Sequence, residues 1–168
     1  MRKIKNKLYY IIAGEASGDL HGANLMSSIY KKDSSVSFRG VGGPLMKKGG
    51  LLSLIDFNRL AVMGFVEVLK DLSFFIKSKK IIVTDIQSNL PEKIILIDYP
   101  GFNLSLAKII KKTTKIPIIF YISPQVWAWK ETRINNIKKY IDRLIVVFPF
   151  EVSWYKKRGV VVEYFGHS

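Results

Sequence analysis

Short apolar runs recur along the chain, and segments with the periodicity of helices lie between them. The expected strands are Leu8–Ala13, Val36–Arg39, Ile94–Asp98, Ile118–Ile122, Arg143–Phe148 and Val160–Tyr164. The expected helices are about Asp19–Lys31, Leu60–Ser78, Lys79–Ser88, Leu104–Lys112, Glu131–Tyr140 and Glu151–Lys157. Runs that are apolar throughout are typical of parallel strands buried on both faces. The alternation therefore predicts an α/β chain with right-handed crossovers and a Rossmann-like, doubly wound, mainly parallel sheet.

Length and composition bound the possible functions. A chain of 168 residues suits one domain, and we find no internal repeat or linker that would divide it. The absence of cysteine excludes a disulfide framework and any thiolate site, and with only two histidines we expect no metal and no cofactor. No apolar run approaches the ~20 residues of a membrane-spanning helix.

The formal net charge of +14 favours anionic partners such as nucleic acid, lipid headgroups or phosphorylated ligands. A lysine- and isoleucine-rich composition also arises from an AT-rich genome without selection for binding. A nucleic-acid-binding domain would gather lysines and exposed aromatic residues on one face. Here the lysines are spread over several expected helices, so we expect no nucleic-acid partner.

Five loops of unusual composition follow expected strands. They are Gly14–Gly18, Gly40–Pro44, Asp98–Asn103, Ser123–Trp129 and Phe148–Glu151. Parallel sheets bind ligands outside the carboxyl ends of their strands, so these loops should converge on one crevice.

The first loop enters a helix. Gly14 and Gly18 permit a close backbone approach, and free amides at a helix start can receive an anion or a sugar hydroxyl. Alternatively, Ser17 or Asp19 caps that helix. His21 is expected to be a surface residue.

The second loop contains Gly42 and Gly43, through which a ligand could approach the backbone. The alternative is a purely structural turn that leads into a helix. Pro44 suits the first position of that helix, where the missing amide proton costs nothing.

Asp98 closes the apolar run Ile94–Ile97 and should face the crevice. A partly desolvated carboxylate has a raised pKa and suits general-base work. The alternative is an aspartate that caps or ties down the turn at Gly101–Asn103.

The segment Leu60–Ser78 leaves more apolar surface than one helix face can bury. A core-facing stripe comprises Phe65, Val66, Leu69, Leu72 and Ile76. Phe74 and Phe75 fall outside this stripe, and the flanking lysines include Lys77, Lys79 and Lys80. Such a helix can lie on an anionic membrane surface, or its extra apolar residues can pack against a neighbour.

These motifs, taken together, resemble the bacterial lipid-A-disaccharide synthase family. The matching elements are GEASGD, GVGGP-x-M, LAVMGF-x-E, IDYPGFN, YISPQVWAWK followed by Arg133, FPFE, and Gly166-His167. They occur in the family's order from Ile11 to His167.

The resemblance implies the N-terminal, acceptor-side domain of a GT-B type glycosyltransferase. Such enzymes join UDP-2,3-diacylglucosamine to 2,3-diacylglucosamine 1-phosphate with inversion and without a metal, and work peripherally at the cytoplasmic face of the inner membrane. Asp98 matches the family's proposed general base toward the acceptor 6-hydroxyl. The residues expected to bind substrate are Gly14, Ser17, Gly18, Asp19, Gly42, Gly43, Met63, Asn103, Ser123, Gln125, Trp129 and Arg133.

In the YISPQVWAWK stretch we expect Trp127 to pack inward. We expect Trp129 to line the acceptor entrance with Arg133, whose guanidinium could pair with the acceptor phosphate.

One departure from the family concerns length. Family members are more than twice as long, and a second domain with most of the UDP-sugar site follows their Gly-His-Pro segment. Here the sequence reads Gly166-His167-Ser168 and stops. We therefore expect residues 1–168 to form a single domain whose C-terminal partner domain is missing. The chain could be an engineered piece, a fragment, or one product of a split or decayed gene. We expect it to be inactive without a second domain, and the alternative function is that of a non-catalytic remnant or a basic, anion-binding Rossmann-like domain.

Overall fold

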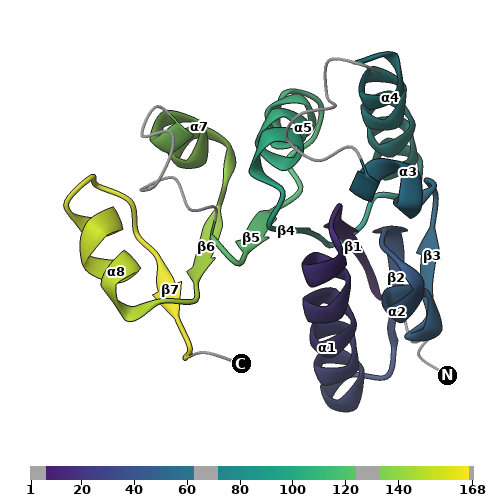
Figure 1. Cartoon of the computed structure of the whole chain (residues 1–168), viewed down its shortest axis with the longest axis horizontal. Helices are drawn as coiled ribbons and strands as arrows, with labels where there is room; N and C mark the ends of the chain where they lie inside the picture. The colour runs from purple at the N-terminus through teal and green to yellow at the C-terminus, as the bar shows by residue number, and fades with distance from the viewer. Residues whose placement is uncertain (1–6, 63–71, 124–132, 167–168) are drawn as a thin grey trace, which may run out of the picture.

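The computed structural model describes residues 7–62, 72–123 and 133–166. Within these residues, seven strands form one sheet in the order β3-β2-β1-β4-β5-β6-β7, and every neighbouring pair is parallel (Figure 1). The strands are β1 (Lys7–Ala13), β2 (Val36–Val41), β3 (Leu51–Ser53), β4 (Lys93–Ile97), β5 (Ile118–Tyr121), β6 (Arg143–Val146) and β7 (Glu163–Tyr164). The predicted doubly wound α/β fold is confirmed.

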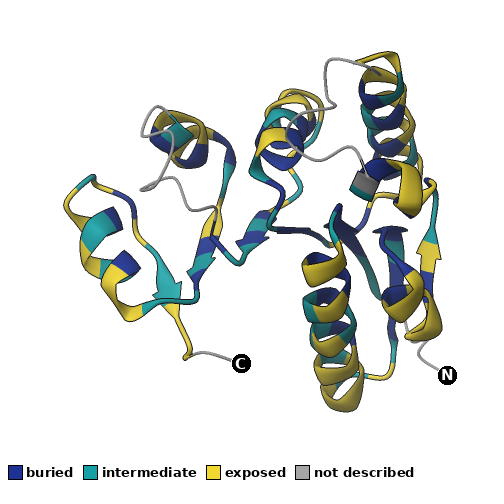
Figure 2. Ribbon diagram, in the orientation of Figure 1, coloured by how far each residue is buried: buried dark blue, intermediate teal, exposed yellow. Residues whose placement is uncertain are grey.

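Helices cover both faces of this sheet. They are α1 (Ala16–Lys32), α2 (Pro44–Lys48), α3 (Phe57–Val62), α4 (Leu72–Asn89), α5 (Pro100–Thr113), α7 (Arg133–Tyr140) and α8 (Pro149–Lys156). One core packs α1 and α2 against the sheet, and a larger core on the opposite face takes side chains from α3, α4, α5, α7 and α8. The central strands are consequently buried on both sides (Figure 2).

Several predicted strand boundaries need correction. The prediction missed β3, whose three residues are too few to form a recognisable apolar run. Of the predicted strand Val160–Tyr164, only Glu163–Tyr164 pairs with β6. Edge strands contribute little buried surface, so their sequence signal is weak.

The predicted helices differ in their ends. The predicted break between Ser78 and Lys79 is wrong, because α4 runs through both residues. Helices α1 and α5 begin three and four residues earlier than predicted, at Ala16 and Pro100. Pro44 does open a short helix, as its chemistry suggested.

Of the predicted core-facing stripe, Phe65, Val66 and Leu69 lie outside the described residues, and the two described members on α4 are wrongly placed. Phe75 is buried and packs edge-on against Phe102 at a centroid distance of 5.6 Å. Leu72 and Ile76, which the prediction placed in the core, are 58% and 60% exposed. The helix is therefore rotated, and it leaves a different pair of apolar side chains on its outer face.

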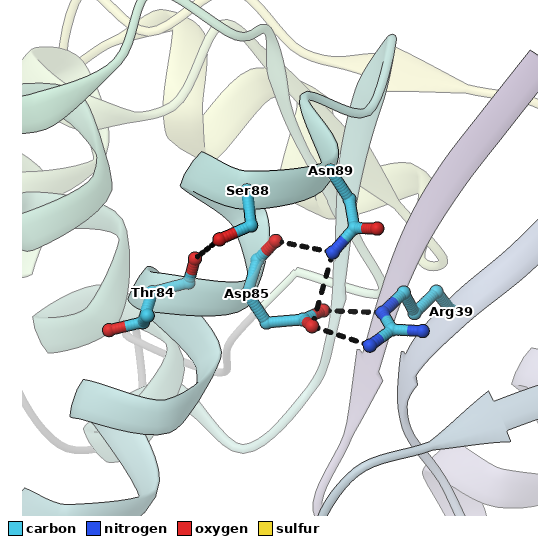
Figure 3. A network of polar contacts seen from close by, with 5 residues as sticks. All are labelled: Arg39, Thr84, Asp85, Ser88 and Asn89. Carbon is cyan, nitrogen blue, oxygen red and sulfur yellow. Dashed lines mark hydrogen bonds and ion pairs between the residues drawn. The ribbon is translucent and has the colours of Figure 1, made fainter.

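An ion pair fixes α4 to the sheet. The guanidinium of Arg39 on β2 donates two hydrogen bonds, of 2.6 and 2.5 Å, to the carboxylate of Asp85 (Figure 3). The side-chain amide of Asn89 donates to the Asp85 carbonyl at 2.8 Å and to its carboxylate at 3.1 Å. This network ties the second half of α4 to the β2 side of the sheet.

The strand order reverses between β1 and β4. The chain passes from β1 outward through β2 and β3, then returns to place β4 on the other side of β1. Crossovers leave these two strands in opposite directions, so the loops after them flank the topological switch point where such sheets bind ligands. None of the helices in the described parts of the chain is long and apolar enough to cross a membrane.

Candidate functional site at the switch point

Asp98 follows the last residue of β4 directly at the switch point. In the sheet register Ala13 of β1 pairs with Ile97 of β4, so the next residues, Gly14 and Asp98, leave the sheet side by side. The Asp98 side chain is half-buried, which matches the partly desolvated position predicted for it.

The turn that carries Asp98 has an uncommon backbone. Asp98 and Tyr99 have φ angles of +47° and +49°, a left-handed conformation that side chains seldom adopt twice in succession. The Asn103 amide holds this turn, because its Nδ2 donates to the carbonyls of Ile97 at 3.3 Å and Asp98 at 2.8 Å. The first turn of α5 follows at once from Pro100, so the backbone fixes the direction in which the Asp98 side chain leaves the chain.

Of the alternative roles predicted for Asp98, capping α5 is contradicted, whereas its carboxylate does accept a hydrogen bond within the turn, from the backbone N–H of Tyr99. Tyr99 occupies the N-cap position of α5, and no side chain caps that end. Asn103 ties down the main chain of Asp98. Asn103, predicted to contact substrate, is fully buried and acts through this turn.

Burial raises the pKa of Asp98 above its ordinary value, and this is the largest effect on the group. A hydrogen bond from the backbone N–H of Tyr99 and the charge of His21 act in the opposite direction on this pKa. A carboxylate with a raised pKa is a better proton acceptor than a free one, as general-base catalysis requires.

Sequence reasoning missed three neighbours of Asp98. Burial also raises the pKa of Glu15, and the charge of Asp98 raises it further. Burial and the charge of Glu15 raise the pKa of Tyr99 to about 12. His21, expected at the surface, is half-buried and close enough to influence Asp98. Glu15 could have been found from its position, because it follows β1 closely, as Asp98 follows the neighbouring strand β4.

Asp19 has a structural role that the sequence did not predict. It is buried, and its carboxylate accepts hydrogen bonds from the amides of Gly43 at 2.8 Å, Leu45 at 3.0 Å and Met46 at 3.0 Å. Asp19 therefore caps α2 rather than its own helix. The expectation that Asp19 or Ser17 caps α1 is wrong, because Glu15 holds that N-cap position without a side-chain bond.

The amides of the second glycine loop are used within the protein. The Gly43 amide binds Asp19, and the Gly42 amide donates to Ser53 Oγ at 3.3 Å. A Cβ on Gly42 would meet Met46 Sδ at 2.6 Å and Leu51 at 2.7 Å. The structural alternative therefore accounts for both glycines.

The first glycine loop faces the site more directly. A Cβ on Gly14 would lie 2.3 Å from Cδ1 of Tyr99, and a Cβ on Gly18 would lie 3.2 Å from that of Ala13. Gly14 thus lets the loop after β1 touch the loop after β4, and Gly18 lets α1 approach the sheet. Ser17, an exposed residue in the first turn of α1, lies on the same edge.

The two remaining described positions lie further along this edge. Ser123 is buried after β5, and its hydroxyl lies 2.6 Å from that of Tyr155, so it joins the loop to α8. Arg133 is half-buried at the start of α7, and burial lowers its pKa. The predicted residues Met63, Gln125, Trp127 and Trp129 lie outside the described residues.

The predicted membrane-contact set is corrected in part. Phe75 is in the core, and Phe74 packs partly against it with the Arg59 guanidinium 4.3 Å from its ring centroid. Lys79 is half-buried with its ammonium 5.5 Å from the ring centroid of Phe102, and burial lowers its pKa. Lys77 and Lys80 are exposed. Across the three described ranges, no cluster of three acidic, histidine or cysteine side chains could hold a metal ion.

The family profile and the similar curated proteins all belong to one family. The profile of the lipid-A-disaccharide synthetase family matches residues 9–168. The chain is 46% identical over 162 residues to a lipid-A-disaccharide synthase of Geobacter metallireducens, which covers 96% of this chain and 42% of that protein. It is 43% identical over 157 residues to lipid-A-disaccharide synthase 1 of Legionella pneumophila, covering 94% of this chain and 41% of that protein. The chain thus spans about two fifths of the length of these relatives.

Proposed function

Because the chain belongs to the lipid-A-disaccharide synthetase family, we propose that it is the acceptor-side domain of a glycosyltransferase of lipid A biosynthesis. The whole enzyme would join UDP-2,3-diacylglucosamine to 2,3-diacylglucosamine 1-phosphate. The products are the lipid A disaccharide 1-phosphate and UDP. The region of the relatives beyond this match would supply the UDP-sugar site.

The observation that carries this proposal is the placement of Asp98. A half-buried carboxyl group with a raised pKa lies at the switch point, on a backbone turn that Asn103 holds in place. A sugar hydroxyl attacks efficiently only if a base accepts its proton as the new bond forms. Asp98 would take the proton of the acceptor 6-hydroxyl, while that oxygen bonds to the anomeric carbon and the bond from that carbon to UDP breaks.

The groups near Asp98 suit a sugar phosphate as the acceptor. Ser17 and the first turn of α1 offer a hydroxyl and backbone amides at the same edge, without a side-chain cap from Glu15. Arg133 begins α7, two strands away from β1 on the β5 side, and could pair with the acceptor phosphate. We do not include Asp19, Gly42 or Gly43 as contacts, because their polar groups are bonded within the protein.

Acceptor binding by the isolated chain tests this proposal. Amide resonances of Glu15, Tyr99 and Gly101 should shift when 2,3-diacylglucosamine 1-phosphate with short acyl chains is added. UDP alone should shift them little, because the UDP-sugar site would lie on the other domain. The proposal fails if the acceptor leaves these amides unchanged, or if UDP moves them as strongly as the acceptor does.

We also propose that the outer face of α4 contacts an anionic membrane surface at the cytoplasmic side of the inner membrane. Leu72 and Ile76 are exposed apolar residues one turn apart, and Lys77 and Lys80 lie beside them. Exposed apolar side chains flanked by lysines suit an interface, where each basic residue contributes about 1 kcal/mol.

Vesicle sedimentation with the double variant Leu72→Ser/Ile76→Ser tests this surface. Binding to phosphatidylglycerol-containing vesicles should fall, while Leu45→Ser, an exposed leucine on the opposite sheet face, should leave it unchanged. Equal binding by both variants would exclude the α4 face as the apolar contact.

A further inference from the structure

Glu15 occupies the position across the switch point from the proposed base. Strands β1 and β4 are neighbours, with Ala13 opposite Ile97, and each strand ends at that pair. Glu15 lies two residues beyond Ala13, and Asp98 lies one residue beyond Ile97. The sheet register therefore brings two half-buried carboxyl groups to the same point of the crevice.

The loops that carry these two groups are held against each other. Gly14 packs so closely on the ring of Tyr99 that a Cβ there would approach to 2.3 Å. Asn103 fixes the turn at Asp98 and Tyr99 through two carbonyls. These contacts hold the backbones that carry the two carboxyl groups side by side.

A buried hydroxyl completes the cluster. Tyr99 is 9% exposed, and within the described part of the chain its hydroxyl has no hydrogen-bond partner. The charge of Glu15 acts on this phenol, so Tyr99 lies within the electrostatic reach of Glu15. An unpartnered buried hydroxyl beside two carboxyl groups suits a place where a polar ligand or a proton is exchanged.

We propose that Glu15 is a positioning residue that acts through Asp98. The two carboxyl groups form a coupled pair across the switch point, and the charge on Glu15 sets how strongly the ionised Asp98 carboxylate attracts a proton. This inference rests on the function proposed above, since it assigns Glu15 a role in the same proton transfer. Glu15 does not itself touch the reacting atoms in this account.

The electrostatics give the order in which the pair loses its protons. Burial raises the pKa of both groups, but only Asp98 is favoured in its charged form by His21 and by the Tyr99 amide. The negative charge of Asp98 then raises the pKa of Glu15 further. Asp98 therefore ionises first, and Glu15 keeps its proton to a higher pH. The groups that bear on the pair are His21 from α1 and Tyr99 from the turn before α5.

This order has a chemical consequence for the base. While Glu15 is neutral, Asp98 carries the only negative charge of the pair. Once Glu15 also ionises, repulsion makes the Asp98 carboxylate more basic and better able to accept the acceptor proton. The pair would therefore make the strength of the base depend on pH.

Carboxyl-carbon NMR titration of this chain tests the coupling without any substrate. Asp98→Asn removes the charge that acts on Glu15, so the Glu15 midpoint should move to a lower pH. Glu15→Gln should leave the Asp98 midpoint nearly unchanged, because Glu15 is still neutral when Asp98 ionises. As a matched control, Glu92→Gln removes an exposed carboxyl group at the opposite end of β4 and should change neither midpoint.

A pH–rate profile of this chain fused to the remaining region of a full-length relative tests the role of Glu15. Transfer by the wild type should rise in two steps with pH, whereas Glu15→Gln should rise in one step with a severalfold lower plateau. Glu15→Asp, which keeps the charge, should restore the second step. A purely structural role for Glu15 would instead lower the melting temperature and keep both steps.

The outcomes separate this inference from the function on which it rests. An unmoved Glu15 midpoint in Asp98→Asn overturns the coupling, even if Asp98→Asn also abolishes transfer. Conversely, a shifted midpoint in a fused protein that transfers no sugar supports the coupling and overturns the proposed function.

Discussion

Gly14 and Tyr99 lie in direct contact across the switch point, with room for a hydrogen but not for a methyl group on residue 14. This contact joins the loop after β1 to the left-handed turn after β4. The chain therefore positions Asp98 through packing between loops as well as through the backbone of the turn.

Gly14→Ala should displace the Tyr99 ring and destabilise the chain. Overpacking of this kind costs about 1–3 kcal/mol, which urea unfolding followed by far-UV circular dichroism can measure. Gly101→Ala is the matched control, because a Cβ there would meet nothing within 4 Å and Gly101 lies in helix α5. The control should be neutral or stabilising by up to about 1 kcal/mol. Equal losses in both variants would contradict the packing account.

Asp98→Asn should raise the stability of the isolated chain at neutral pH. The folded pKa of Asp98 lies above its ordinary value of 3.8, so the folded chain holds this proton to a higher pH than the unfolded chain does. Stability therefore falls as pH rises from 3.8 through the folded pKa, and the loss persists above it. The asparagine variant lacks this loss.

Thermal melts of the wild type and Asp98→Asn at pH 4 and pH 7 check this sign. Asp98→Asn should melt at a higher temperature than the wild type, and this difference should be larger at pH 7 than at pH 4. Glu92→Gln, an exposed carboxyl change, should show no such difference. A variant less stable than the wild type at pH 7 would mean that the Asp98 carboxylate stabilises the fold.

Asp19→Asn should weaken the start of α2. The variant loses the charge and one acceptor oxygen that now serve three backbone amides, at a cost of about 1–3 kcal/mol. Hydrogen exchange at the amides of Gly43, Leu45 and Met46 should accelerate. Ser17→Ala, an exposed change two residues earlier, should stay within about 0.5 kcal/mol of the wild type. Unchanged exchange at the three amides would exclude the cap.

The Arg39–Asp85 pair should contribute more to stability than an exposed pair of the same geometry. Both this pair and Arg143–Glu163 are joined by two hydrogen bonds. The side chains of Arg39 and Asp85 are 24% and 14% exposed. Those of Arg143 and Glu163 are 53% and 32% exposed. Double-mutant cycles in urea should give a coupling above about 1 kcal/mol for the first pair and below it for the second. Equal couplings would show that burial does not strengthen the pair.

The sheet could be predicted because its central strands are continuous apolar runs. Lys93–Ile97 and Ile118–Tyr121 have no alternation to confuse their assignment, since both faces are covered. The phase of α4 could not be predicted, because apolar residues occur on several sides of this helix and tertiary packing chose Phe75 over Leu72. The edge strand β3 was not predicted because it has only three residues.

The features of the site that follow from sheet topology could be predicted from the sequence. Those that depend on side-chain partners could not. Asp98 could be placed because parallel strands end at one edge of the sheet, and its pKa direction followed from burial. Asp19 could not be assigned, because its partners belong to a loop 24 residues away in the sequence. Glu15 was overlooked because its significance depends on which strands are neighbours.

The most direct test of the account is the transfer rate of Asp98→Asn in this chain fused to the remaining region of a full-length relative. Loss of a general base lowers kcat by about 10²–10⁴, while the Michaelis constants of both substrates should stay within severalfold of the wild type. Glu92→Gln should transfer at the wild-type rate. This outcome would establish Asp98 as the group that accepts the acceptor proton, whereas near-normal turnover by Asp98→Asn would contradict the account.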